Sequence, residues 1–320
     1  MVRRTTLLSL AALALVAIGA IGFGVANIAP LDVLAIIGKS VVGLPVGGEI
    51  SAGSTAIVME IRLPRILAAI AVGALYEKVG APVVVTDPAS AETIKYAANA
   101  FLATKISYIN AVAAICEGVG ADINDVVLGL GYDKRIGHEF LRPGPGWGGS
   151  CFPKDTKAMV KIAQDAGYDF GLLKGVITVN EQQYGRIVDK IRAAAGGTLK
   201  GKKIASWGLT FKALTDDLRD SPAVEIITRL LADGASVAVF DPTVTVAPKG
   251  LDAITVCSSP LEACAGVDVI AVLTEWDDFR WVSPVEAAGA VSVKQIVDAR
   301  NLLDRSEWRR AGFEYQGIGR

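Results

Sequence analysis

The sequence predicts an α/β protein with a helical central domain, followed by a Rossmann-like doubly wound parallel sheet and preceded by hydrophobic, membrane-type helices. Three observations lead to this fold class. Residues 5–31 carry no charge. Residues 90–195 hold two long segments with helical apolar spacing. From residue 203 onward, short β-branched runs alternate with helical patterns, which is typical of parallel sheets with right-handed crossovers.

Length and charge narrow the classes of function. The chain has 320 residues and a net charge of −1, so no general attraction to nucleic acid is expected. Its 4 cysteines show no metal-binding spacing, and there is 1 histidine, so a histidine-rich metal site is not expected. We predict three parts with boundaries near residues 75 and 198, namely 1–75, 76–198 and 199–320.

The first part is predicted to contain a membrane-spanning helix. The apolar core from Leu7 to Val25 is close to the roughly 20 residues that cross a bilayer. Arg3 and Arg4 precede it and would hold the N-terminus in the cytoplasm. Membrane contact is therefore expected through residues 5–28. A cleaved signal peptide has the same positive flank and is the alternative.

A second apolar stretch begins after Arg62-Leu63-Pro64-Arg65 and covers residues 66–75. About ten residues are too few to span a membrane unassisted. Residues 1–75 resemble the N-terminal region of iron-siderophore ABC transporter permeases, in which a first helix, a periplasmic segment and an Arg-Leu-Pro-Arg entry follow one another. The resemblance implies a membrane-transport fragment, although so few helices cannot build a translocation path.

The central part is predicted to be mainly helical. Ser90 is the expected N-cap of a long helix that continues through Cys116 and ends at Gly118 and Gly120. A shorter helix is expected over 122–128. A second long helix is expected over 173–195, where two glycines follow it.

The last part is predicted to alternate between strands and helices. Strands are expected over 203–209, 236–241, 254–257, 267–273 and 293–298, and helices over 222–233 and 260–264. The run 267–273 is apolar and β-branched, as a strand buried on both faces should be.

The segment Gly148-Gly149-Ser150-Cys151-Phe152-Pro153-Lys154-Asp155 carries the most chemical information. Helical spacing begins at Lys154, so Cys151 is expected at a helix N-terminus, where the positive end of the peptide dipoles favours thiolate. Lys154 adds a cation and Asp155 a possible base within one turn. This combination is typical of covalent catalysis. An inert buried cysteine beside a tight turn is the alternative.

Lys95 and Asn99 are four residues apart and so share one helix face, where they could stabilise a negatively charged oxygen. Further short motifs follow the cysteine segment in order. They are Phe211-Lys212, the run 215–222 (TDDLRDSP), Leu273-Thr274-Glu275-Trp276 and the run 297–301 (VDARN). Together with residues 90–103, these motifs closely resemble the UDP-glucose/GDP-mannose dehydrogenase family over residues 75–320, and its UDP-glucose members best.

The resemblance implies two successive NAD-dependent oxidations of a sugar CH2OH group to a carboxylate. Cys151 would attack the aldehyde-level intermediate as a thiolate. The thiohemiacetal would give up hydride to a second NAD, and water would hydrolyse the thioester. Lys95 would stabilise the alkoxide or oxyanion and Asn99 would hydrogen-bond the same oxygen. Asp155 would assist proton transfer or orient the lysine and water.

The resemblance also implies binding residues. The nucleotide sugar, UDP-glucose or a relative, would contact Arg135, Phe140, Leu141, Arg142, Gly144, Trp147, Gly148, Phe211, Lys212 and Arg300. The NAD cofactor would contact Lys154 and Arg219. Arg135 matches an arginine that reaches into the neighbouring subunit, so a homodimer through the long central helix is expected. Trp147 stands where the family usually has a smaller aromatic residue.

One family feature is missing from the sequence. The Gly-x-Gly-x-x-Gly turn that cradles the NAD pyrophosphate does not occur between Met1 and Leu75. We therefore expect a permease fragment fused to a truncated dehydrogenase, with its catalytic part in the cytoplasm and little turnover alone. A non-catalytic UDP-sugar-binding or dimerisation module is a further alternative.

Overall fold

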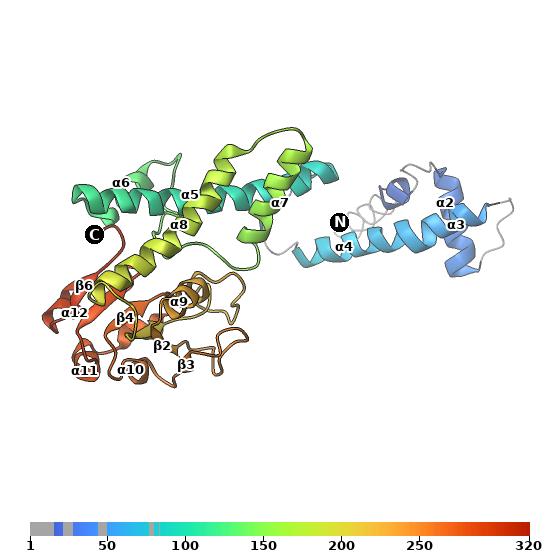
Figure 1. The fold of residues 1–320 in the computed structure, drawn as a ribbon. Coiled ribbons are helices and arrows are strands. Elements are labelled where there is room, and N and C mark those ends of the chain that lie inside the picture. The colour runs from blue at the N-terminus through green and yellow to red at the C-terminus, as the bar shows by residue number, and fades with distance from the viewer. Residues whose placement is uncertain (1–15, 22–27, 44–49, 77–79, 83) are drawn as a thin grey trace, which may run out of the picture. The chain divides into compact units, whose positions relative to one another are not determined.

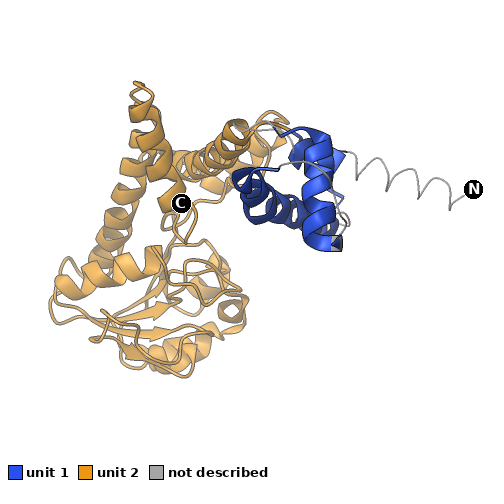
Figure 2. Ribbon diagram, turned by 90° about the vertical axis from the view of Figure 1, so that its right-hand side faces the viewer, with its two compact units in different colours: residues 1–85 blue, residues 86–320 orange. Residues whose placement is uncertain are grey.

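The computed structural model describes residues 16–21, 28–43, 50–76, 80–82 and 84–320. The chain forms two compact units, Met1–Val85 and Thr86–Arg320, each of which is described by itself (Figure 2). The predicted membrane span over residues 5–28 lies largely outside the described residues.

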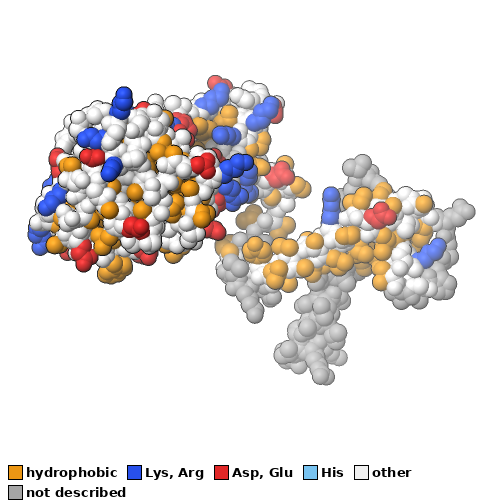
Figure 3. Space-filling model, turned by 60° about the horizontal axis from the view of Figure 1, so that its bottom comes forward, with side chains coloured by type: hydrophobic (Ala, Val, Ile, Leu, Met, Phe, Trp, Pro, Cys, Tyr) orange, Lys and Arg blue, Asp and Glu red, His pale blue; other side chains and the backbone are white. Residues whose placement is uncertain are grey.

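The first unit is a small helical assembly. Its elements are α2 (Pro30–Ile37), η1 (Gly38–Val42), α3 (Ala52–Ala56), η2 (Ile57–Arg62) and α4 (Leu63–Tyr76). A small core forms around Ile21, Val33, Ile36 and Val58. Helix α4 buries none of its residues, and hydrophobic side chains lie exposed on this unit (Figure 3).

The predicted membrane-type helices receive no support from the described residues. Helix α4 has 14 residues, fewer than a membrane span requires. Within the described ranges, only α5 (Pro88–Val119) in the second unit is long and apolar enough to cross a bilayer. The core helix of a soluble protein has the same properties, and α5 packs against three other helices.

The helical layer of the second unit consists of α5, α6 (Ile123–Tyr132), α7 (Phe152–Asp165) and α8 (Gly171–Ala194) (Figure 1). Helix α5 begins two residues before the predicted cap. Asp87 is the N-cap, since its carboxylate accepts a hydrogen bond from the Ser90 amide at 2.9 Å. Gly120 ends the helix in the left-handed conformation, as predicted.

A six-stranded parallel sheet follows, with the strand order β3-β2-β1-β4-β5-β6. Its strands are β1 (Lys203–Trp207), β2 (Ser236–Phe240), β3 (Thr255–Val256), β4 (Val269–Val272), β5 (Gln295–Asp298) and β6 (Glu314–Gln316). This is the Rossmann strand order, which confirms the predicted doubly wound sheet.

Side chains of successive strand residues point to opposite faces, and each face has its own core. Val269 and Ala271 of β4 pack with α8 and α9 (Pro222–Ala232). Ile270 and Val272 pack on the other face. That face is covered by α10 (Pro260–Ala263), η4 (Asp277–Trp281), α11 (Pro284–Ala290) and α12 (Arg305–Arg310). Because both faces are covered, the central strand β4 is apolar throughout.

Helix α8 links the two layers of the second unit. Its first half packs on α5 and α7, and its second half reaches α9, β4 and β5 (Figure 1). Residues of α5 and α8 therefore lie in the same core as the sheet. The segment between α6 and α7, residues 133–151, therefore contacts both the helical layer and the sheet domain.

Candidate active site

The cysteine segment lies where the sequence predicts it, at the start of α7. Cys151 is the N-cap residue and is exposed. Its carbonyl oxygen accepts a hydrogen bond from the Asp155 amide at 2.8 Å, which places Asp155 one turn along the helix. Lys154 and Arg219 both interact electrostatically with the Cys151 thiol. The sulfur thus lies at a helix N-terminus and within electrostatic range of two cations.

Asp155 joins the cysteine helix to α5. Its side chain is completely buried, and one carboxylate oxygen accepts hydrogen bonds from Lys95 Nζ and Asn99 Nδ2, each at 2.6 Å. The other oxygen accepts one from Lys154 Nζ at 2.5 Å. Burial alone would raise the pKa of Asp155, but these hydrogen bonds outweigh it and lower the pKa to about 2. The carboxylate is therefore ionised at neutral pH and fixes both lysines and the amide within one turn of Cys151.

The two glycines before Cys151 permit a close approach to the loop between β1 and α9. A Cβ atom on Gly148 would lie 1.9 Å from the Asp220 carbonyl oxygen. The Gly149 amide donates to the Arg219 carbonyl oxygen at 3.0 Å, and a Cβ there would lie 2.8 Å from the Phe211 ring. Gly149 also has a φ of +81°, which favours glycine. These contacts bring Phe211 and Arg219 of the sheet layer beside the thiol segment.

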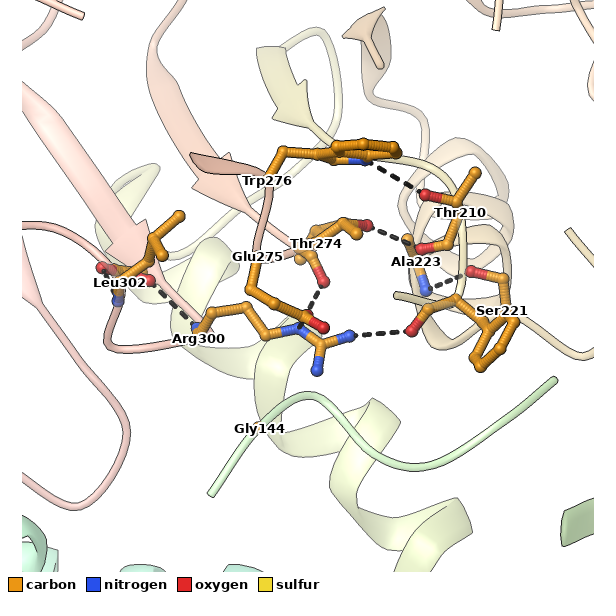
Figure 4. A network of polar contacts seen from close by, with 12 residues as sticks. Gly144, Thr210, Ser221, Ala223, Thr274, Glu275, Trp276, Arg300 and Leu302 are labelled. Atoms are coloured by element: carbon orange, nitrogen blue, oxygen red, sulfur yellow. Dashed lines mark hydrogen bonds and ion pairs between the residues drawn. The ribbon is translucent and has the colours of Figure 1, made fainter. Parts of the chain in front are cut away.

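Arg300 closes the site from the end of β5 (Figure 4). Its Nε donates to the Leu273 carbonyl oxygen at 2.9 Å and lies 3.0 Å from a Glu275 oxygen, and its Nη2 donates to the Phe211 carbonyl oxygen at 3.1 Å. A Cβ atom on Gly144 would lie 3.4 Å from Arg300 Nη1. Desolvation by burial lowers the pKa of Arg300, although Glu275 opposes the shift.

Buried polar side chains pin the glycine-rich loop over residues 143–149. Asn180 of α8 accepts from the Trp147 amide at 2.8 Å and donates to the Trp147 carbonyl oxygen at 3.0 Å. Gln183 donates to the Gly144 carbonyl oxygen, while Asn110 of α5 accepts from the Gly144 amide, both at 2.8 Å. The two helices thus replace the hydrogen bonds that a neighbouring strand would supply.

Reasoning from the sequence missed these residues. Asn110 and Asn180 lie on the buried sides of long helices, and each is at most 3% exposed. An amide side chain on the apolar face of a predicted helix could have indicated such a contact from the sequence, because buried polar groups are hydrogen-bonded in folded proteins. Trp147 belongs to the same network, since its indole Nε1 donates to Ser107 at 2.9 Å and the residue is 5% exposed.

We expect Asn180→Ala to destabilise the fold and loosen this loop. The variant leaves the buried Trp147 amide without its side-chain partner, which should cost about 2 kcal/mol, whereas the Trp147 carbonyl keeps the hydrogen bond that Tyr184 donates at 3.1 Å. Urea unfolding would measure the loss, and hydrogen exchange at the Trp147 amide should accelerate at least tenfold. Gln182→Ala, on the exposed side of α8, is the control. Unchanged exchange at Trp147 would show that the loop is held by other contacts.

Several predicted binding residues lie apart from this cluster or face solvent. Arg135 is exposed and pairs with Asp133 at 2.6 Å. Phe140 packs edge-on against Phe152, with ring centroids 6.3 Å apart. Leu141 is part of the hydrophobic core. Two further residues are exposed cations, namely Arg142 and Lys212.

The residues of the sheet domain do not fit an NAD pyrophosphate and ribose. In dinucleotide-binding sheets an acidic residue near the end of the second strand hydrogen-bonds the ribose. Here that position is Asp241, which is 2% exposed. Its carboxylate already accepts from the Leu209 and Thr210 amides at 2.8 and 3.0 Å and from Trp276 Nε1 at 3.1 Å. Lys154 and Arg219 lie beside the thiol, but the described residues form no cradle for the dinucleotide.

The fold is that of an α/β protein with a helical layer and a parallel sheet in the Rossmann strand order. The site carries an exposed thiol at the start of a helix in the helical layer. Two family models match the chain. One is the central domain of the UDP-glucose/GDP-mannose dehydrogenase family, over residues 89–182, and the other is its UDP-binding domain, over residues 205–305. The chain belongs to the UDP-glucose/GDP-mannose dehydrogenase family.

Individual relatives agree with this assignment. A UDP-glucose 6-dehydrogenase of Rhizobium meliloti is 44% identical over 240 residues, which cover 75% of this chain and 55% of the relative. A UDP-glucose 6-dehydrogenase of Bacillus subtilis is 46% identical over 241 residues, with 75% and 54% covered. A solved UDP-glucose dehydrogenase of Pyrobaculum islandicum superimposes with a TM-score of 0.69 at 34% identity, with 80% and 56% covered.

The chain spans about half the length of these relatives. Both family models match residues within 89–305, so the resemblance of residues 1–75 to siderophore permeases and the predicted fusion stay predictions.

Proposed function

We propose that the second unit binds UDP-glucose or a related nucleotide sugar and presents its C6 carbon to Cys151. The observation that carries this proposal is the bridge from Asp155 to Lys95, Asn99 and Lys154, one helical turn from the thiol. An inert surface cysteine would not require a buried carboxylate that holds two lysines in place one helical turn away. Relatives named UDP-glucose 6-dehydrogenase support the choice of sugar nucleotide.

The chemistry assigned to the site is thiol addition to an aldehyde-level carbon. The Cys151 sulfur forms a bond to that carbon, and the carbonyl oxygen takes up the electron pair as an oxyanion. Lys95 and Asn99 donate hydrogen bonds to this oxygen, while Asp155 holds both donors in place.

We assign the nucleotide and sugar to the region where the loop over 143–149 meets the sheet domain. Gly144 and Gly148 let the sheet domain approach this loop closely, and Phe211 and Arg300 contribute to the site from that domain. Arg142 and Lys212 supply exposed cations for the diphosphate. All four cysteines are free, which suits a reducing compartment, so we place this unit in the cytoplasm.

The family cofactor, NAD, would accept hydride in the complete reaction. Because the described residues form no dinucleotide cradle, we propose that this chain alone turns over little or no NAD. Purified full-length chain with UDP-glucose and NAD should give no steady increase in NADH absorbance. Sustained NADH formation that is lost in Cys151→Ala would contradict the low-turnover proposal and support the thiol assignment.

Thiol alkylation tests the site without requiring turnover. We expect iodoacetamide to modify exposed Cys151 at least 100-fold faster than buried Cys116 and Cys264, and UDP-glucose to slow that modification at least tenfold. Mass spectrometry of the digested protein would follow each cysteine, and partly buried Cys257 is the internal control. A Cys151 rate unaffected by UDP-glucose would contradict the proposed site. Stronger protection by GDP-mannose would redirect the substrate assignment.

A homodimer through α5 is a second proposal, favoured by one observation. Ile94, Phe101, Tyr108 and Ile115 are each more than half exposed and recur every seven residues. Such spacing places four large apolar side chains along one face of a helix and suits pairing with a second copy. Analytical ultracentrifugation should give the mass of a dimer, and Phe101→Glu should give a monomer. A monomeric parent chain would contradict it.

A further inference from the structure

A cavity lies between α5, α8 and the end of β6, and no residue of the Cys151 segment lines it. Its volume is about 310 Å³. Polar lining comes from Asn110, Gln183, Arg186 and Gln316, and apolar lining from Ala114 and Ile187. None of these residues has a part in the thiol chemistry proposed above.

One charge in the cavity wall has no counter-ion. Lys190 pairs with Glu117 at 2.9 Å, and Asp189 pairs with Arg192. Of the four charged residues that line the cavity, Glu117, Asp189 and Lys190 therefore each have a partner of opposite charge, which leaves Arg186. Arg186 is exposed, and no ion pair or hydrogen bond joins its guanidinium to another residue in the described part of the chain. The cavity therefore offers a planar cation with its donors free.

A buried amide donor lies in the same wall. Asn110 is 1% exposed, and its Nδ2 has no hydrogen-bond partner, although its Oδ1 accepts from the Gly144 amide. Asn110 and Arg186 also both line a smaller hollow of about 50 Å³ next to the main cavity. Buried polar atoms are normally satisfied, so an unused donor beside an unused cation marks a place for an acceptor, either an ordered water or a ligand atom.

The cavity is separate from the apolar stripe on α5. Asn110, Ala114 and Glu117 follow the spacing of one helix face. Asn110 is two residues from Tyr108, which corresponds to a rotation of roughly 200° about the helix axis. A second copy of the chain on the stripe would therefore leave the cavity open.

We propose that this cavity binds a small organic carboxylate, with the carboxylate on Arg186 and the adjacent amide donors and the carbon body against Ala114 and Ile187. A planar carboxylate matches the fork of guanidinium donors, and one negative charge balances the unpaired arginine. Because Asn110 and Gln183 also hold the amide and carbonyl of Gly144, the ligand contacts two supports of the nucleotide-sugar loop.

Benzoate is a suitable probe, and benzamide is its uncharged counterpart of the same shape. In proton–nitrogen NMR titrations of the full chain, benzoate should shift the backbone signals of Ala114 and Gly144 in a saturable manner. Arg186→Gln should weaken the binding of benzoate at least tenfold. Because Arg186 is exposed, the variant should fold, and melting temperature checks this. Arg309→Gln changes another exposed arginine and should leave benzoate binding unchanged.

The outcomes separate this proposal from the function proposed for the thiol site. Equal binding of benzamide would show an apolar hollow that does not recognise charge, and stronger binding of inorganic phosphate would show a different anion class. Equal affinity in the parent and Arg186→Gln would also overturn the proposal. Shifts confined to residues around Cys151 and Phe211 would place benzoate in the nucleotide-sugar site instead. No UDP-sugar is present, so failure here leaves the thiol site untouched.

Discussion

Gly148→Ala is expected to disrupt the candidate active site more than any other single methyl addition. The new Cβ would lie 1.9 Å from the Asp220 carbonyl oxygen and 2.8 Å from Pro222 Cδ. Both neighbours belong to a backbone turn that cannot rotate away as a flexible side chain would. The cysteine segment and the 211–220 loop must therefore separate, at a cost of about 3 kcal/mol. Binding of UDP-glucose, followed by calorimetry, should weaken at least tenfold.

Gly175→Ala is the matched control. It lies on the exposed side of α8, and a Cβ there would meet nothing within 4 Å. This variant should be neutral or stabilise the protein by up to about 1 kcal/mol, because alanine restricts the unfolded chain and favours helix. If Gly148→Ala matched it in both urea unfolding and UDP-glucose affinity, the close contact between the two loops would not exist in solution.

The double variant Lys95→Met/Lys154→Met is expected to have the second largest effect. It removes both cations from Asp155, whose side chain remains completely buried. A buried carboxylate without a counter-charge costs about 3–5 kcal/mol at neutral pH. Each single variant leaves one lysine in place and should cost far less, so the two effects should not be additive. Urea unfolding of all three variants at pH 7 would measure the coupling.

The pH dependence of stability should reverse in this variant. In the parent chain the pKa of Asp155 is lowered from 3.8 to about 2, so its contribution is complete above pH 4 and is lost as pH falls toward 2. We expect that contribution to be about 1–2 kcal/mol, because both lysines are exposed to solvent. Without the lysines, burial raises the pKa of Asp155, and the variant should gain stability on acidification from pH 7.

Adding Asp155→Asn to the Lys95→Met/Lys154→Met variant should restore stability. It removes the buried charge while keeping the size of the side chain, so most of the lost stability at pH 7 should return. A double variant as stable as the parent, with an unchanged pH profile, would show that water reaches Asp155 and that the bridge contributes little.

The sequence predicted the elements whose signals are local. The helix spacing after Lys154, the glycine at position 120 and the β-branched run of β4 all led to elements that the structure contains. The predicted N-cap of α5 was wrong by three residues, because Asp87 is the better acceptor for the free amides of the first turn. The short elements α11, α12 and β6 carry little periodicity and were not predicted.

Sequence alone also determined the chemical inventory of the site, namely one thiol, two lysines, an amide and a carboxylate in a recognisable order. Only the tertiary structure decided how they meet. Asp155 and Lys95 are 60 residues apart, and their contact exists because α7 packs on α5. The amides that pin Gly144 and Trp147, and the unpaired Arg186 beside its cavity, depend on the crossing of α5 and α8. Side chains far apart in the sequence meet only through helix packing, and no local pattern records which faces will touch.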